Sequence, residues 1–388
     1  MQVKGLLRYL GYISYSVLVV SLYPISSLLV HTKRNAFYKN SCLHISYMVH
    51  IPWYTVKLLR KHGINARYLA IGCSPVWDKC DYQFVPSRWR CIRAVQEFLF
   101  FWRVVAKYEV IHFHFMITLC DTGWELPLLR RLGRKLVFQY RGCEIRDREK
   151  NVRLHPEMNI CEDCDYGATA CKGEINLKRR RLANKYGDLS LITTPDLSDF
   201  APDAIYLPFF APEIEPAVSW KQKRGAHRLK IVHATNHPGI EGTEYIQKAI
   251  DNLVNQGYEI DFVSLTNSSH DRVLEEFATA DLTIGKMKMG YYANAQIESM
   301  VMGVPTITHV RPEFMTEELR ESGFIFSTLN ELEETIRYYL DHPEELLMKR
   351  RIARSTILRI HNNERLVDQL VRMYQSLRCR ENLVMFPV

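Results

Sequence analysis

The sequence predicts an α/β protein of two doubly wound, Rossmann-like domains that face each other across a cleft, with an apolar segment at the N-terminus. From Asn40 onward, short apolar runs alternate with amphipathic helical stretches, which is typical of parallel sheets covered by helices. A proline-rich passage, LPFFAPEIEPAV, and the basic run WKQKRGAHR interrupt this alternation near the middle of the chain. The 388 residues are enough for two cores, and ligands bind where the carboxyl ends of such sheets meet.

The apolar segment occupies residues 1–34. Tyr9 to Val30 contains no charged side chain, has basic residues on both flanks, and is long enough to span a bilayer. Pro24 and several Ser and Tyr residues lower its apolarity, so a helix in the membrane interface, or one buried against protein, is the alternative. We expect membrane attachment, and the even flanking charges assign no topology.

Composition limits the partners and the compartment. With 47% hydrophobic and 24% charged residues the chain is globular rather than disordered. A formal charge of +8 favours anionic partners: nucleotide phosphates, an anionic membrane surface or nucleic acid. Ten cysteines without a convincing cleaved signal peptide indicate a reducing compartment. We therefore expect a cytoplasmic protein at the inner face of a membrane.

The first domain is predicted at residues 35–212. Its strands are predicted at Leu43–Tyr47, Ala66–Ile71, Val110–Phe115, Lys135–Tyr140 and Leu189–Thr193. Helices are predicted at Tyr54–His62, Val95–Tyr108 and Leu126–Leu132, the first and third ending at glycines.

A linker at residues 213–228 leads to a second domain, residues 229–360, followed by a C-terminal helix and tail at 361–388. The predicted strands are Leu229–Ala234, Glu259–Leu265, Leu282–Ile284 and Thr306–Val310. The predicted helices are Thr243–Asn255, Asp271–Ala278, Asn294–Met302 and a helical region from Leu329 to Leu377.

One stretch of the second domain, Asp281 to Pro305, reads as a strand, a turn at Gly290 and a helix closed by Gly303. The first backbone N–H groups of such a helix have no partner within it and carry the positive end of its dipole, so an anionic phosphate is the natural ligand. Glu298 lies about one turn into this helix, where its carboxylate can accept hydrogen bonds from sugar hydroxyls.

Several segments carry a family resemblance. QIESMVMGVPTI resembles the signature of family 4-like bacterial glycosyltransferases of the GT-B fold, and IVHATNHPGIEGTEYI resembles the first strand and loop of their second domain. GKMKMGYYANAQ is similar to their diphosphate loop, and IHFHF and LPLLRRLGRKLVFQYRGCEIR are similar to first-domain segments. The resemblance covers about residues 40 to 375. It implies a retaining enzyme, without a catalytic metal or other cofactor, that moves a sugar from a nucleotide diphosphate to a saccharide or lipid-linked acceptor.

The resemblance also implies residue roles. Glu298 matches the glutamate that binds the donor ribose, and with Arg141 it is the implied catalytic pair. The other implied donor-binding residues are Asn236, His237, Gly242, Thr243, Gly290, Tyr291, Tyr292, Ala293 and Asn294.

Three departures alter that pattern. Gly290 stands where the family expects a second glutamate, and Glu241 stands where it expects a phosphate-binding basic residue. Because a carboxylate does not hold a diphosphate, we expect Lys286 or Lys288 to supply the positive charge. Arg141 replaces a histidine, so it can stabilise charge but cannot act as a base near neutral pH. The alternative function is therefore a non-catalytic GT-B scaffold or binding protein with a degenerate donor site.

On the acceptor side, His112 and His114 alternate along one strand and face the same side of the sheet. The loop MVHIPWY after the first strand places His50, Trp53 and Tyr54 at the same rim. Aromatic faces stack on sugar rings, although they also fill cores. We expect these five residues to contact the acceptor.

The run CEDCDYGATAC contains Cys161, Cys164 and Cys171, and a C-x2-C hook lets two thiolates meet one zinc ion. Cys143 or His155 would complete a closed, structural site; the alternative is a set of reduced cysteines without a ligand. The basic run from Lys178 to Arg181 is expected to be a solvated helix face. The third hypothesis is a zinc-containing nucleic-acid binder. Because we favour the glycosyltransferase hypothesis, we expect no nucleic-acid partner.

Overall fold

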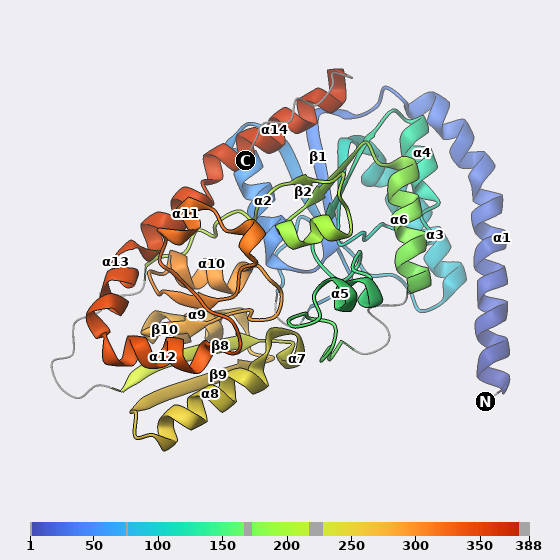
Figure 1. Ribbon diagram of the computed structural model, residues 1–388. Helices are drawn as coiled ribbons and strands as arrows, with labels where there is room; N and C mark the ends of the chain where they lie inside the picture. The colour runs from blue at the N-terminus through green and yellow to red at the C-terminus, as the bar shows by residue number, and fades with distance from the viewer. Residues whose placement is uncertain (1, 75–76, 121, 167–172, 217–227, 380–388) are drawn as a thin grey trace.

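The computed structural model describes residues 2–74, 77–120, 122–166, 173–216 and 228–379. It contains two parallel sheets, each covered by helices, joined into one elongated molecule (Figure 1). The predicted fold class is confirmed: two α/β halves of seven and five strands lie beside each other, and the apolar N-terminal segment is a helix.

The first sheet has the strand order β3-β2-β1-β4-β5-β6-β7, and all of its neighbouring strands are parallel. The strands are β1 (Tyr38–Tyr47), β2 (Asn65–Ile71), β3 (Tyr82–Phe84), β4 (Tyr108–His114), β5 (Lys135–Tyr140), β6 (Leu189–Ile192) and β7 (Ile205–Tyr206). The order reverses between β1 and β4, which is where doubly wound sheets form a crevice at the carboxyl ends of their strands.

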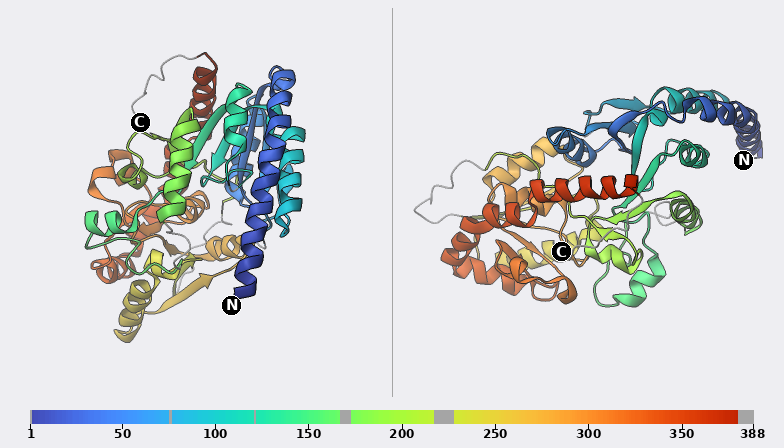
Figure 2. Two further views of the ribbon diagram at one scale, coloured as in Figure 1. Left: turned by 90° about the vertical axis from the view of Figure 1, so that its right-hand side faces the viewer. Right: turned by 90° about the horizontal axis from the view of Figure 1, so that it is seen from above.

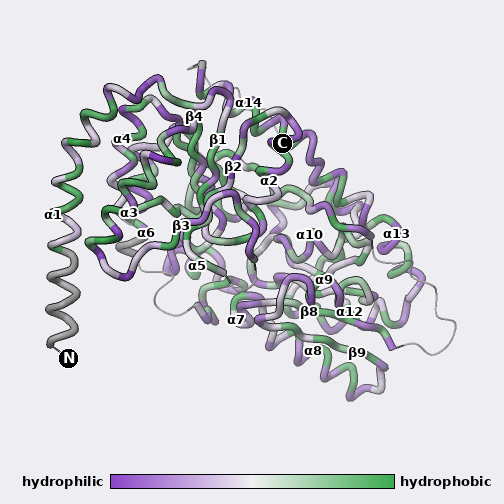
Figure 3. Tube along the Cα trace, turned by 180° about the vertical axis from the view of Figure 1, so that it is seen from behind, coloured by the Kyte–Doolittle hydropathy of each residue, from purple (hydrophilic) through white to green (hydrophobic). Residues whose placement is uncertain are grey.

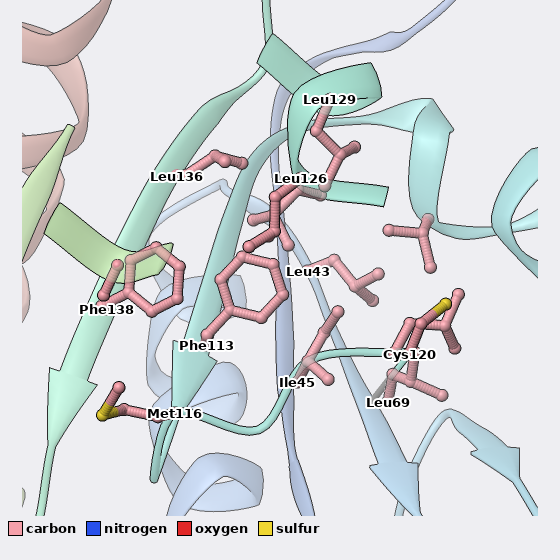
Figure 4. Packing of buried hydrophobic residues seen from close by; sticks show 14 of the residues in the cluster. Leu43, Ile45, Leu69, Phe113, Met116, Cys120, Leu126, Leu129, Leu136 and Phe138 are labelled. Carbon is pink, nitrogen blue, oxygen red and sulfur yellow. The ribbon is translucent and has the colours of Figure 1, made fainter. Parts of the chain in front are cut away.

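Helices cover both faces of this sheet. They are α1 (Gln2–Lys33), α2 (His50–Lys61), α3 (Arg90–Arg103), α4 (Glu125–Arg131), α5 (Arg148–Leu154) and α6 (Gly173–Tyr186). Alternate residues of β1 point to opposite faces: Leu43 and Ile45 pack with α3 and α4, whereas Cys42 packs with α2. Figure 4 shows the first of these cores, in which Phe113 and Phe138 stack 4.9 Å apart between their centroids.

The second sheet has the order β12-β11-β10-β8-β9 and is also parallel. Its strands are β8 (Leu229–Thr235), β9 (Ile260–Thr266), β10 (Leu282–Ile284), β11 (Thr306–Thr308) and β12 (Phe324–Phe326). Its helices are α7 (Pro238–Glu241), α8 (Thr243–Asn255), α9 (His270–Thr279), α10 (Asn294–Val301), α11 (Glu317–Arg320), α12 (Leu332–Asp341) and α13 (Pro343–Ile360).

The last helix, α14 (Asn363–Cys379), returns to the first half of the molecule (Figure 2). Its buried residues Leu366, Leu370 and Tyr374 pack with α2 and with β1 and β2. The chain therefore crosses twice between the halves, once near residue 212 and once near residue 362.

Two element predictions were wrong in detail. The helix predicted at Val95–Tyr108 ends at Arg103, and Tyr108 begins β4, because a short 3-10 turn at Val105–Lys107 separates the two. The segment predicted as a loop after the first strand is the start of α2, whose first residue is His50. The two- and three-residue strands β3, β7 and β12 were not predicted, because such short runs carry little periodicity.

The N-terminal helix α1 lies along α3 and α4 (Figure 3). The Tyr15 hydroxyl donates a buried 2.5 Å hydrogen bond to Glu97 on α3, and Ser26 and Val30 are fully or almost fully buried. Residues Ile13–Lys33 are long and apolar enough to cross a membrane, by length and composition alone. The outer face of α1 exposes Val20 and Leu28, each about 70% accessible.

Candidate functional site

The helix α10 and its preceding loop face the first half of the molecule. The Ala293 N–H, just before the helix, donates to Gln296 Oε1 at 3.1 Å, which fixes the start of the helix. One turn further, Glu298 is buried and its Oε1 accepts a hydrogen bond from His270 Nε2 at 2.9 Å. His50 Nε2, from the first half, lies 3.6 Å from the same oxygen.

The two histidines beside Glu298 respond to it in opposite directions. The hydrogen bond to Glu298 raises the pKa of His270, whereas burial lowers the pKa of His50 despite the nearby carboxylate. Their rings are nearly parallel, with centroids 5.0 Å apart. Glu298 is thus a carboxylate held ready at the boundary between the halves by a donor that a sugar hydroxyl could replace.

A small pocket joins these residues across the two halves. It is lined by His50, Ile51, Tyr54, Phe210, Pro212, Asn294 and Glu298. The structure therefore brings the predicted donor residues Asn294 and Glu298 together with the predicted acceptor-side residues His50 and Tyr54. Trp77 contacts the His50 and Tyr54 rings edge to face at 5.8 and 6.0 Å.

Trp53 lies elsewhere on the same helix. It packs against the apolar cluster formed with α14, and the Arg60 guanidinium lies 5.7 Å from its ring. Although Trp53 is only one turn from His50, it does not line the pocket that His50 and Tyr54 line. The expectation that the three side chains share one rim is corrected for Trp53.

Both lysines expected to neutralise a diphosphate are already paired. Lys286 Nζ forms an ion pair with Glu241, and Lys288 Nζ forms one with Asp163 of the first half. The side chain of Lys288 is 4% exposed, whereas that of Asp163 is 49% exposed. Lys286 was expected to supply the positive charge that is missing at position 241. Instead, its charge is neutralised by the carboxylate of Glu241 itself.

The loop after β8 is held by local contacts. Asn236 Oδ1 accepts from the Asn267 N–H at 3.2 Å, and the His237 ring lies 3.7 Å from that of Tyr166. Gly242 has φ +84°, a left-handed conformation that favours glycine, and ends α7. Thr243 Oγ1 lies 2.8 Å from His233 Nε2.

Tyr291 and Tyr292 are buried and stack 4.4 Å apart. The Tyr292 hydroxyl bonds to His361 Nε2 at 3.0 Å, at the point where the chain leaves α13. Their side chains therefore fix the loop to the protein interior. These side chains leave only the backbone of the two residues for a ligand.

Arg141 follows β5 directly and is half-buried, and its Nε donates to His114 Nδ1 at 3.2 Å. Burial lowers the pKa of Arg141 to about 9. The guanidinium lies 5.6 Å from the rings of Phe115 and Phe209, and its Nη1 is buried without a hydrogen-bond partner. That free donor suits the charge-stabilising role expected for Arg141.

His114 begins a one-directional chain of hydrogen bonds. Since Arg141 is always a donor, His114 Nδ1 is an acceptor and its Nε2–H donates to His44 Nδ1 at 2.9 Å. His44 Nε2–H then donates to the Tyr374 hydroxyl at 3.2 Å, and this hydroxyl donates to His112 Nδ1 at 2.6 Å. Burial lowers the pKa of all three histidines, to about 3 for His44, so all are neutral.

This chain corrects the expectation that His112 and His114 contact an acceptor. Both rings are completely buried, because β4 is a central strand and α14 covers this face of the sheet. They connect Arg141 to the C-terminal helix instead of facing the cleft.

Metal-capable groups occur in two places among the described residues. One is the buried set His44, His112 and His114, and the other is His50, His270 and Glu298. Cys143, Cys161 and Cys164 pack in one small apolar cluster but do not form a third such group, and Cys171 lies outside the described residues. His155 is bonded to Asp199 and Arg311 at 3.0 and 2.7 Å.

The sequence pattern did not single out His270, Trp77 or Arg311. His270 carries no motif beyond the Ser269 cap that starts its helix, and Trp77 follows a loop without periodicity. Arg311 had a usable signal, since it lies just beyond the carboxyl end of β11, where ligands of open α/β sheets bind.

No protein-family model and no curated protein matches this sequence. Solved structures are similar in fold. Sucrose-phosphate synthase from Thermosynechococcus elongatus has a TM-score of 0.56 at 13% identity, covering 88% of this chain and 100% of that chain. HepE from Anabaena, in complex with UDP and glucose, has a TM-score of 0.56 at 11% identity, covering 86% of this chain and 99% of that chain. The catalytic domain of starch synthase IV from Arabidopsis thaliana, bound to ADP and acarbose, has a TM-score of 0.53 at 10% identity, covering 86% of this chain and 99% of that chain. The chain therefore has the GT-B fold.

Proposed function

We propose that this protein is a glycosyltransferase that moves a sugar from a nucleotide diphosphate donor to a saccharide or lipid-linked acceptor. The observation that carries the proposal is the position of Glu298, buried one turn into α10 and facing the first half across a pocket. The GT-B fold supports it, as do the nucleotide ligands of structures that share this fold, UDP in HepE and ADP in starch synthase IV. We further propose retention of configuration and no need for a catalytic metal.

The direct test is a panel of UDP-, ADP- and GDP-sugars, measured by calorimetry and by release of the nucleoside diphosphate. Glu298→Ala is expected to weaken nucleotide binding by on the order of 1–3 kcal/mol, because it removes a charged acceptor of ribose hydroxyls. Glu364→Ala, an exposed glutamate on α14, is the control. An affinity unchanged by Glu298→Ala, or no nucleotide binding by the native protein, contradicts the proposal.

The second candidate is a GT-B protein that binds a partner without turnover. It is favoured by the two ion pairs that neutralise Lys286 and Lys288, and by Gly290 in place of a glutamate. Turnover with any donor eliminates this candidate. Nucleotide binding without release of a diphosphate, in the presence of glycan or lipid-linked acceptors, supports it.

We propose that the protein works at the cytoplasmic face of a membrane, with α1 lying in the interface. The support is an apolar surface made of Val17, Val20 and Leu28 on α1 with Ile92 and Leu99 on α3, all at least half exposed. A helix tied to α3 by the buried Tyr15–Glu97 hydrogen bond is positioned to lie along a bilayer rather than across it.

We also propose a structural zinc ion held by Cys161, Cys164, Cys171 and Cys143. Cys143 is preferred to His155, because the His155 ring is occupied by Asp199 and Arg311. Metal analysis of the purified protein should give about one zinc per chain. The value should fall in Cys161→Ser and stay unchanged in Cys91→Ser, an exposed cysteine on α3. Protein without zinc contradicts the proposal.

A further inference from the structure

A second polar pocket lies between the halves and is separate from the one beside Glu298. It is lined by Arg146, Asp196 and Asp199 from the first half and by Lys288, Met289 and Arg311 from the second, among others. Three cations therefore converge on one interdomain space. Each has a carboxylate partner: Arg146 pairs with Asp196, Lys288 with Asp163, and Arg311 with Asp199 at 2.9 Å.

Arg311 differs from the other two because one edge of its guanidinium is unused. Its Nη1 donates to Asp199 at 2.9 Å and lies 2.7 Å from His155 Nε2, whereas Nε and Nη2 are buried without any hydrogen-bond partner. The residue is only 9% exposed. Nε and Nη2 form the side of the guanidinium that binds a carboxylate or phosphate through two parallel hydrogen bonds. Leaving two such donors unsatisfied is costly unless a ligand completes them.

Arg311 also explains the glycine at position 290. A Cβ at Gly290 would lie 2.7 Å from Arg311 Cγ and 3.0 Å from Nε, so no other side chain fits there while Arg311 keeps its place. Gly290 has φ +81°, and its carbonyl oxygen accepts from the Arg311 N–H at 3.0 Å. The guanidinium is further held against the Phe314 ring at 4.4 Å. The Arg311 side chain thus fills the space beside position 290, where the family that the sequence resembles is expected to have a glutamate.

We propose that Arg311 forms an oxyanion subsite in this second interdomain pocket, in which Nε and Nη2 bind one carboxylate or phosphate group of the donor. The ligand class follows from the charge: a fork of donors recognises an oxyanion, whereas a glutamate would recognise a neutral hydroxyl. The oxyanion is either the carboxylate of an acidic donor sugar or a phosphate of the nucleotide. Because the pocket walls come from both halves, a ligand bound there contacts both of them.

The proposal rests on the proposed function for the identity of the ligand as a nucleotide sugar. The test uses the full chain and three ligands, UDP, UDP-glucose and UDP-glucuronate, measured by calorimetry. The two sugars differ only in a hydroxymethyl group against a carboxylate. Arg311→Lys keeps the charge without the fork, and Arg311→Gln removes the charge. Arg350→Gln, a partly buried arginine that donates to the Ala280 carbonyl away from the cleft, is the matched control.

If the sugar carries the oxyanion, the native protein binds UDP-glucuronate about tenfold more tightly than UDP-glucose, and both Arg311 variants abolish this preference without changing UDP affinity. If a phosphate is the oxyanion, Arg311→Gln weakens all three ligands by about tenfold and no preference appears. Less than twofold change with every ligand overturns the subsite.

If the native protein binds none of these nucleotides, the subsite is tested with pyrophosphate and free glucuronate, and the quantity measured is the unfolding temperature of the protein. A rise in unfolding temperature that Arg311→Gln abolishes and Arg350→Gln retains supports the subsite while the proposed donor fails. A rise that does not depend on Arg311, or no rise, overturns it.

Discussion

Glu298 is the residue on which the proposed donor site depends, and the structure surrounds it with two histidines of different character. His270 donates to it from the same half, and His50 approaches it from the other half. A protonated His270 binds the carboxylate most strongly, so it competes with sugar hydroxyls for the same oxygen. The carboxylate is therefore available to a ligand chiefly when His270 is neutral.

His270→Gln tests this contact through the pH dependence of stability. The pKa of His270 is raised in the folded protein, so its contribution is fully present below about pH 6.5, the ordinary value. It is lost as the pH rises through the higher folded pKa. The variant should be less stable than the native protein by on the order of 1–2 kcal/mol at pH 5.5, and the difference should shrink toward pH 9.

Urea unfolding at four pH values measures this difference. His342→Gln, an exposed histidine on the far side of the second half, controls for the loss of one imidazole. The charge of His270 is one of the causes that lower the pKa of His50, so the measured difference includes the response of His50 to the substitution. A difference that grows with pH would contradict the assignment.

Single residues were predictable where they belonged to a pattern. Glu298 and the Gly290 turn follow from their spacing around a helix start, and the structure places both as expected relative to α10. Lys286 and Lys288 were correctly located beside that loop, but their ion pairs depend on Glu241 and Asp163, which come from other segments. Arg311 was missed because its position after a strand does not reveal its environment. Its contacts with His155 and Asp199 come from the other half of the molecule.

At the scale of elements, the helix α14 is part of the first half although it follows the second in sequence. Its Tyr374 hydroxyl is the central link between His44 and His112 on neighbouring strands. No pattern in the sequence predicts these two hydrogen bonds, since they join residues separated by 262 and 330 positions. The alternation of residues along β4 predicted that His112 and His114 share a face, but not that a helix covers it or that His44 joins them.

Tyr374→Phe should destabilise the protein by roughly 2–4 kcal/mol, because it leaves one buried donor and one buried acceptor without partners. Tyr338→Phe, on an exposed tyrosine of α12, should cost less than about 0.5 kcal/mol. Chemical unfolding measures both. Equal effects of the two substitutions would show that the hydrogen-bond chain contributes nothing beyond packing.

The helix α1 makes a separate prediction about the membrane. Val20→Asp with Leu28→Asp should reduce binding to vesicles of anionic phospholipid at least about tenfold, since burying each such side chain contributes roughly 1.5–3 kcal/mol. Val254→Asp, on the exposed face of α8, should leave binding unchanged. Co-sedimentation measures the binding. Alkaline carbonate should release the native protein from membranes, and resistance to it would indicate a helix that spans the bilayer.

At the scale of the whole molecule, the two halves and the cleft between them were predictable, whereas the side-chain contacts that join the halves were not. Each sheet follows from local alternation of apolar runs, which depends on residues close in sequence. Ion pairs join the halves across the cleft, among them Asp163 with Lys288 and Asp199 with Arg311. Charged side chains in loops have no periodicity, so nothing in the sequence specifies which of them meet.

These two ion pairs predict how the molecule opens. Asp163→Asn combined with Asp199→Asn removes both carboxylates, leaving Lys288 and Arg311 to repel each other and Arg146 across the pocket. The double variant should therefore have a larger radius of gyration in solution scattering at low salt, with unchanged circular dichroism. Asp188→Asn, which breaks an ion pair with Arg130 within the first half, should leave the radius unchanged. Because the same substitutions free the cations for a ligand, a bound nucleotide or pyrophosphate should restore the compact form. A double variant as compact as the native protein would show that α14 and the apolar contacts between the halves suffice to close the cleft.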